Sequence, residues 1–157
     1  LPTIQEQSRL LYGQVGELIN HPGFEGSVGV KSGWQIGGII PPAPGSDEAN
    51  WEARFRQVTG QAFLKAFRSL KGGGTITETE GMKAEQAISR MNQSQSEKEF
   101  IAAAEEFKSI LKEGIRQQAN KAKQSIPLWA YNKPDDFPGT DTEWDILTDE
   151  EKAACLP

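Results

Sequence analysis

The chain has 157 residues, a formal net charge of −5 at pH 7 and 36% apolar residues. This length allows one domain with extensions, although the apolar share lies below the roughly 45–50% of an average domain. The charge gives no general reason to expect a nucleic-acid or membrane-surface binder, and no apolar run approaches the roughly 20 residues of a membrane span. A single cysteine, Cys155, excludes an internal disulfide and a multi-cysteine zinc site. Because the first residue is Leu1 and not Met, we expect a processed product or a fragment of a longer protein.

The first element is a predicted helix over residues 3–20. Thr3 and Glu6 have the spacing of a capping box, which satisfies free N–H groups at a helix start. The apolar residues that trace one face of this helix are Ile4, Leu11, Val15, Leu18 and Ile19. Asn20-His21-Pro22-Gly23 is a strong stop signal.

Residues 23–46 are predicted to be irregular, because glycines oppose a helix and the closing prolines oppose a central strand. One interpretation is an ordered loop anchored by Trp34 and the isoleucines. The other is a segment that orders only against a partner, since it carries apolar groups without a period. The candidate interaction residues here are Trp34, Ile39 and Ile40.

The central part of the chain shows three helical patterns, predicted over residues 47–71, 78–92 and 96–125. Apolar residues recur at steps of three and four, which is typical of helices that each bury one stripe. The stripe residues are Trp51, Phe55, Val58, Ala62, Phe63, Phe67 and Leu70, then Ala84, Ala87, Ile88 and Met91, then Phe100, Ala104, Phe107, Ile110, Leu111 and Ile115. Gly60 suggests a close helix crossing more than a break, and Gly72, Gly73 and Gly74 predict the structural turn between the first two helices. Short connections predict antiparallel neighbours, so we expect a mainly α fold of helical bundles or hairpins.

The remaining chain is predicted to be a tail. We place the helical domain at residues 1–133 and an extended, acidic, aromatic tail at residues 134–157, with one short helix capped by Thr148. Residues 134–157 carry eight acids and one base, whereas the other residues have a net charge of +2. Such a tail is either solvated or docked on a basic surface of a partner or neighbouring subunit. The candidate interaction residues in this part of the chain are Trp129 and Tyr131, just before the tail, and Phe137 and Trp144 within it.

The sequence offers no catalytic, cofactor-binding or metal-binding residues that we would assign. Lys71 precedes the glycines of residues 72–74, whereas a phosphate loop needs a glycine-lysine-Ser/Thr ending. The same stretch resembles the second half of a calcium loop, but Lys71 and Gly73 would stand where carboxylates are needed. His21, the single histidine, abuts Pro22 at a helix stop and is interpreted as structural. The adjacent Glu105 and Glu106 point in different directions along a helix and do not form an acid–base pair.

A basic group ends the last long predicted helix: Lys112, Arg116, Lys121 and Lys123. Cations are favourable at a helix C-terminus, and we expect these side chains to face solvent. Weak contact with a polyanion is the alternative.

One stretch resembles a known context. Gly60-Gln61-Ala62-Phe63-Leu64-Lys65-Ala66-Phe67-Arg68-Ser69-Leu70-Lys71-Gly72-Gly73-Gly74-Thr75-Ile76-Thr77-Glu78-Thr79-Glu80-Gly81, continued by residues 87–97 and Phe100, is similar to a helix–glycine turn–helix segment. That segment occurs in virion-associated proteins of tailed bacteriophages and prophages, including DNA-transfer or ejection-type proteins. The resemblance covers about residues 47–123 and rests on packing and turn positions, so it implies a context and no active site.

The resemblance implies a non-enzymatic virion or assembly protein that acts through protein–protein contacts, with itself or with other virion proteins. Its expected location is the virion, and the host cytoplasm during assembly. One alternative is a small helical adaptor or regulator in the host cytoplasm. A second alternative is a cell-wall-degrading accessory domain of an ejection protein, which needs a glutamate with a raised pKa in a cleft. We expect no cofactor, no metal and no specific nucleic-acid partner.

Overall fold

A computed structural model describes residues 3–28, 43–94 and 96–156. Within these residues the chain is mainly α, 74% helical and without a strand, which confirms the predicted class. The elements are α1 (Ile4–Asn20), α2 (Phe24–Ser27), α3 (Asp47–Val58), α4 (Gln61–Gly72), α5 (Glu78–Gln93), α6 (Glu97–Ala122), the 3-10 helix η3 (Leu128–Ala130), α7 (Asp141–Ile146) and α8 (Asp149–Cys155). Trp34, Ile39 and Ile40 lie outside the described residues.

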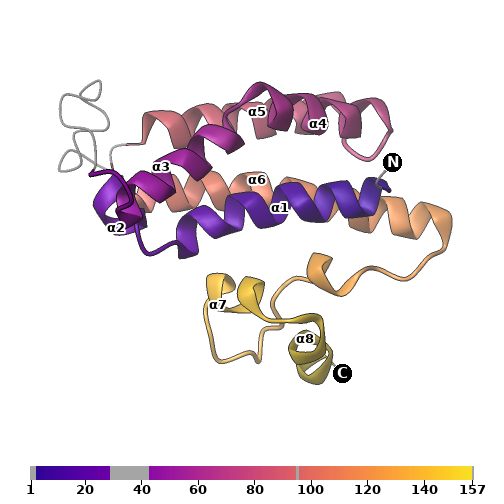
Figure 1. The fold of residues 1–157 in the computed structure, drawn as a ribbon. Coiled ribbons are helices and arrows are strands. Elements are labelled where there is room, and N and C mark those ends of the chain that lie inside the picture. Colours follow the sequence, from indigo (N-terminus) through magenta and orange to yellow (C-terminus); the bar gives the residue numbers. More distant parts are fainter. Residues whose placement is uncertain (1–2, 29–42, 95, 157) are drawn as a thin grey trace.

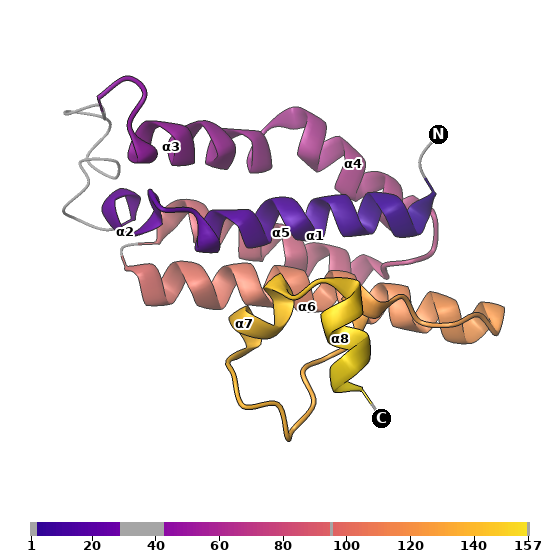
Figure 2. The ribbon, with the colours of Figure 1, turned by 60° about the horizontal axis from the view of Figure 1, so that its bottom comes forward.

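Five helices form the body of the molecule. α5 and α6 form a hairpin, while α1 lies along α6 and also packs against α3 and α4 (Figures 1 and 2). The core between them is aromatic: Phe100 lies 5.7 Å from the rings of both Trp51 and Phe55 between centroids, and Phe107 lies 5.5 Å from Phe67. The amphipathic stripes predicted for these helices therefore meet at one core.

The predicted continuous helix over residues 47–71 is wrong at Gly60. α3 ends at Val58 and α4 begins at Gln61, with Gly60 extended at ψ 165° between them. The Thr59 hydroxyl donates to the carbonyl oxygen of Phe55 at 3.1 Å, and this bond closes the last turn of α3. The break changes the buried face, so that Ala62 is exposed whereas Phe63 is buried.

The glycine turn lies between α4 and α5, as predicted. Gly72 ends α4, and Gly74 is the residue of the turn with a left-handed backbone (φ +78°). Thr75 and Ile76 follow and are buried. They lie against Gly114 of α6, where a Cβ atom would come within 2.8 Å of the Thr75 carbonyl oxygen. Gly114 thus lets the turn approach the α6 backbone closely.

The end of α1 depends on a residue from α3. A helical carbonyl at position 18 ordinarily accepts from the N–H of position 22, which is proline here and has none. The indole N–H of Trp51 donates to the Leu18 carbonyl instead, at 2.8 Å. His21 contributes a local bond at this stop, with its Nδ1 accepting from the N–H of Gly23 at 3.0 Å.

The C-terminal part differs from the predicted extended tail. α6 ends at Ala122, short of the predicted residue 125, and Lys123 turns the chain with a left-handed φ of 52°. The chain then returns to the body through η3, α7 and α8, beside α6 (Figures 1 and 2). Two short helices replace the predicted one, because Thr140 with Glu143 forms a capping box in the same way as Thr148 with Glu151.

Candidate functional site: a buried charge cluster under the C-terminal segment

The strongest concentration of buried charge lies where α7 meets α1 and α6. Asp145 of α7 accepts from Lys108 Nζ at 2.5 Å and from Lys112 Nζ at 2.8 Å. The Tyr12 hydroxyl of α1 donates to the same carboxylate. The side chains of Lys108, Lys112 and Asp145 are only 3%, 10% and 6% exposed. We call Tyr12, Lys108, Lys112 and Asp145 the Asp145 cluster.

Helical spacing explains how α6 supplies two lysines to one carboxylate. Residues four apart lie on the same helix face, so Lys108 and Lys112 stand one above the other. Phe107 and Leu111 precede them by one residue each and are fully buried in the core. The lysines therefore lie at the edge of the core stripe, on the side that α7 covers.

The environment sets the protonation of the cluster. Burial alone would raise the pKa of Asp145, but the charges and hydrogen bonds of Lys108 and Lys112 outweigh it, so this pKa is lowered from its ordinary value. Burial, and then the neighbouring Asp145 carboxylate, raise the pKa of Tyr12. At neutral pH the cluster therefore holds an ionised aspartate and a protonated tyrosine.

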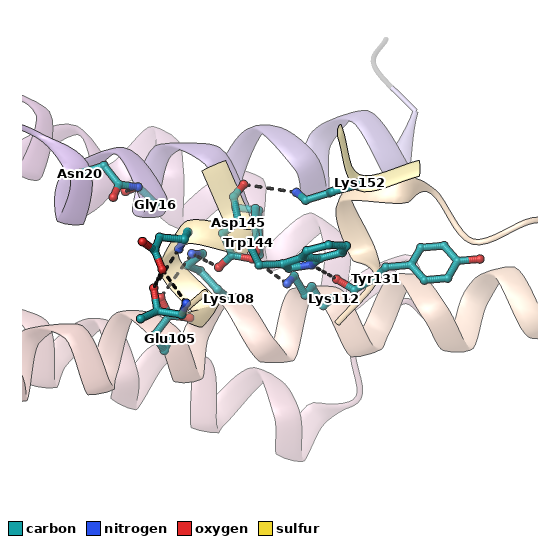
Figure 3. A network of polar contacts seen from close by, with 12 residues as sticks. Gly16, Asn20, Glu105, Lys108, Lys112, Tyr131, Trp144, Asp145 and Lys152 are labelled. Atoms are coloured by element: carbon teal, nitrogen blue, oxygen red, sulfur yellow. Dashed lines mark hydrogen bonds and ion pairs between the residues drawn. The ribbon is translucent and has the colours of Figure 1, made fainter. Parts of the chain in front are cut away.

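A second ring of contacts surrounds the cluster (Figure 3). Lys152 of α8 is 2% exposed, and its Nζ donates to the Asp145 backbone carbonyl at 3.3 Å. Desolvation lowers the pKa of Lys152, and the nearby lysines add to this effect while Asp145 and Asp149 oppose it. Glu105, one turn before Lys108, lies 3.4 Å from its Nζ.

Aromatic rings complete the site. Lys108 Nζ and Lys112 Nζ lie 4.8 Å and 5.2 Å from the centre of the Tyr12 ring, within the range of cation–π attraction. Tyr12 also contacts the Trp129 ring at 5.2 Å between centroids. The site thus joins α1, α6, η3 and α7 through charge and aromatic packing together.

Two cavities flank the cluster. One, of about 300 Å³, is lined by α6 and the C-terminal segment, and includes Ser109, Asn132 and Lys133. The other, of about 380 Å³, runs between α1 and α7–α8 and includes Gly13, Ile146 and Leu147. The Asp145 cluster therefore lies between two open clefts at the junction of the body with α7 and α8.

The chemistry available to the cluster is limited by its own pairing. Asp145 accepts from three donors, so the bonds within the cluster already use its carboxylate. Among residues 3–28, 43–94 and 96–156, no group of three or more His, Cys, Asp or Glu residues is placed to hold a metal ion. The arrangement suits an electrostatic clasp between two parts of the chain.

The structure brings together some of the predicted interaction residues. Trp144 is fully buried and Trp129 is 5% exposed, so both pack within the chain itself. The Trp144 indole N–H donates to the Tyr131 carbonyl at 3.0 Å, and the Phe137 ring lies edge-on to Trp144 at 5.3 Å. Tyr131 and Phe137 are partly exposed.

The predicted basic group on α6 requires a correction at Lys112. We expected it to face solvent, but its side chain is buried because α7 covers it. Lys121 and Lys123 are exposed, as expected. Sequence reasoning missed Lys108 and Asp145 entirely; the available signal was the pair of lysines four apart beside an apolar stripe, in a chain whose C-terminal part is acidic.

No known protein family, curated protein or solved structure matches this chain. In the part of the chain that the structure describes, none of the helices has the length and apolar character needed to cross a membrane.

Proposed function

We propose that this chain is a non-enzymatic structural or assembly component of a tailed-bacteriophage or prophage particle, and that it acts through protein–protein contacts. The observation that carries the proposal is the use of the Asp145 cluster. Its charges pair with one another and hold the chain's own C-terminal segment on α1 and α6, as expected of a scaffold. The phage context comes from the resemblance over residues 47–123.

The contact surfaces of such a scaffold lie outside the clasp. Exposed large apolar side chains in the described residues include Leu10 on α1, Met82 on α5 and Ile146 on α7, which are 60%, 53% and 60% exposed. Burial of such groups against a neighbouring protein would be favourable by about 25 cal/mol for each Å² of apolar surface removed from water. We therefore propose Leu10 and Met82 as contact positions on the body.

The test is particle association. The phage or prophage whose genome encodes the chain is grown, its particles are purified by density gradient, and mass spectrometry measures the chain relative to the major capsid protein. A fixed ratio that survives a second gradient is expected. Loss of the chain during purification would overturn the proposal and favour the adaptor alternative, and release of peptidoglycan fragments by the purified chain would favour the cell-wall alternative.

Surface variants then locate the contact. Leu10→Glu and Met82→Glu are expected to lower the amount of chain in the particles several-fold, with unchanged far-UV circular dichroism. Ala102→Glu is the matched control, because Ala102 is an exposed small residue of α6. These variants are better probes than deletion of residues 134–157, which would remove both the counter-charge and the cover of Lys108 and Lys112 and so change the body itself.

A further inference from the structure

The C-terminal segment, here residues 128–156, behaves as a separate unit. Trp144 is bonded to the Tyr131 carbonyl, Lys152 is bonded to the Asp145 carbonyl, and η3 packs against α8. These contacts all lie within the segment. The segment therefore has internal contacts that do not require its own body.

Its contacts with the body combine ion pairs with apolar packing of η3. Asp145 reaches Lys108, Lys112 and Tyr12, and Asp149 lies 3.3 Å from Arg9 of α1. Trp129 is the apolar anchor, packed on Tyr12 and part of the body core. All of these contacts can form equally well with the body of another copy, because they depend only on residues 128–156 and on α1 and α6.

The connection between the two parts leaves α6 at a left-handed helix end, where the Gln124 N–H donates to the Ala119 carbonyl at 2.9 Å. Lys123 is the one non-glycine residue with positive φ in the described chain, a conformation that disfavours a lysine by about five-fold or more. Residues 123–125 are exposed, and Ile126 and Pro127 are partly exposed. The last turns of α6 project beyond the rest of the body, and the chain has to double back at Lys123 to reach its own Tyr12 (Figure 2).

We propose that residues 128–156 are exchanged between two copies of this chain, so that Asp145 of each copy pairs with Lys108 and Lys112 of the other. Exchange releases Lys123 from the left-handed conformation, with loss of the cap bond from Gln124 N–H to the Ala119 carbonyl, and keeps every contact of the clasp. The partner is a second copy because the body face carries two buried cations and an aromatic platform that this acidic, tryptophan-bearing segment already fits. The inference rests on the proposed contact role and names one partner for it.

The first experiment changes the hinge alone. Purified full-length chain and the variants Lys123→Val, Lys123→Asn and Lys123→Gly are compared by light scattering after size exclusion, over a range of concentrations. Valine disfavours φ above zero, whereas glycine and asparagine accept it. The dimer, at twice the 17.3 kDa mass of the chain, is expected to be more favoured in the valine variant than in wild type, and about five-fold or more less favoured in the glycine variant than in wild type.

The second experiment identifies the interface. Asp145→Lys is one chain, and Lys108→Glu with Lys112→Glu is the other. Each is expected to be monomeric with an undocked segment, and their mixture is expected to form heterodimers, because both exchanged interfaces then pair opposite charges. Cys155, the single cysteine, is exposed and carries donor or acceptor dyes for energy transfer.

Equal dimerisation of the valine and glycine variants would overturn the proposed exchange of the segment. A mixture of the charge-reversed chains that stays monomeric, although each chain keeps wild-type helicity, would overturn it as well. If the charge-reversed chains lose helicity, the hinge series alone decides. Either negative result leaves particle association untouched, since mass spectrometry of purified particles decides that proposal separately.

Discussion

Asp145 Oδ1 and Lys112 Nζ lie 2.8 Å apart although 33 residues separate them in the sequence. This ion pair, together with Lys108, docks the acidic C-terminal segment on the basic face of α6. Of the two interpretations open from the sequence, solvation is excluded for Asp145, and the basic surface on which it docks within one chain is that chain's own α6. Other acids of the segment, such as Asp135, Asp136 and Glu150, are exposed.

Replacing Asp145 with asparagine is expected to release the C-terminal segment. Breaking a buried ion pair by removing one partner costs about 3–5 kcal/mol, because the remaining charges stay buried and uncompensated. Undocking of α7 and α8 would return Lys108 and Lys112 to water and so limits the loss of global stability. Amide hydrogen exchange should therefore accelerate most in residues 141–155. The free energy of unfolding of the body, measured in urea, should fall by less.

Asp149→Asn is the matched control for this variant. Asp149 pairs with Arg9 at 3.3 Å, but the two side chains are 38% and 58% exposed. Exposed pairs contribute about 0.2–1 kcal/mol, so the rate of amide hydrogen exchange in residues 141–155 should change little. Equal acceleration in both variants would show that charge reduction in general, and not the Asp145 cluster, loosens the segment.

Acid is expected to open the same clasp. The pKa of Asp145 is lowered from 3.8 by Lys108 and Lys112, against the effect of burial. The folded state therefore binds its proton less readily than the unfolded state, so the stabilisation is complete above about pH 4 and is lost as the pH falls through the folded pKa. Protonation of Asp145 removes the main counter-charge of Lys108 and Lys112. These two lysines then face Tyr12, Lys152 and Glu105.

The indole ¹H–¹⁵N resonance of Trp129 reports this transition, because the Trp129 ring packs on Tyr12 of α1 and so lies at the contact between the segment and the body. Wild type should lose the docked resonance below about pH 4, whereas Asp145→Asn should lack a pH-dependent step in that range. A wild-type resonance that stays unchanged down to pH 2 would contradict the role assigned to Asp145.

Much of the body could be predicted from apolar periodicity. The stripes containing Phe55, Phe67, Phe100 and Phe107 are buried as predicted, because each helix has to bury one face and the spacing identifies that face. The break at Gly60 was not predicted, since a glycine inside a helical pattern fits either a crossing or a break. The structure shows a break, with Gly60 extended between α3 and α4.

The C-terminal part was predicted less well. The capping pair Thr148–Glu151 was recognised, while the equivalent pair Thr140–Glu143 was overlooked, so one helix was missed. The Asp145 cluster could not be predicted from local pattern. Periodicity places Lys108 and Lys112 on one face, but nothing in the sequence indicates which of eight acids returns to that face.

Trp51→Phe tests whether α1 depends on a donor from α3. The indole N–H supplies the bond that Pro22 cannot give to the Leu18 carbonyl. Phenylalanine keeps an aromatic ring in the core but leaves a buried carbonyl without this donor, which costs about 1–3 kcal/mol. Urea unfolding of the full chain measures the loss.

Pro22→Ala in the Trp51→Phe background is the informative second variant. It restores a backbone N–H at position 22, which can reach the Leu18 carbonyl once α1 continues through His21, now extended at ψ 139°. Part of the lost stability should then return if the missing donor is the cause. No recovery, with α1 still helical, would assign the loss to the smaller ring volume instead.

Gly114→Ala should loosen the contact between the glycine turn and α6. A Cβ atom at this position would lie 2.8 Å from the carbonyl oxygen of Thr75 and 3.3 Å from the Ile76 side chain. The backbone of the turn would have to shift, at a cost of about 1–3 kcal/mol, which exceeds the gain of roughly 1 kcal/mol from replacing glycine by alanine in a helix. Gly13→Ala on α1 is the matched control, because a Cβ there meets nothing within 4 Å and only the helix gain applies. The thermal unfolding temperature should therefore be higher for Gly13→Ala than for wild type, and lower for Gly114→Ala than for wild type. The opposite order of unfolding temperatures would mean that the backbone of the turn shifts with little loss of stability. The close approach of the turn to α6 would then contribute little to the stability of the fold.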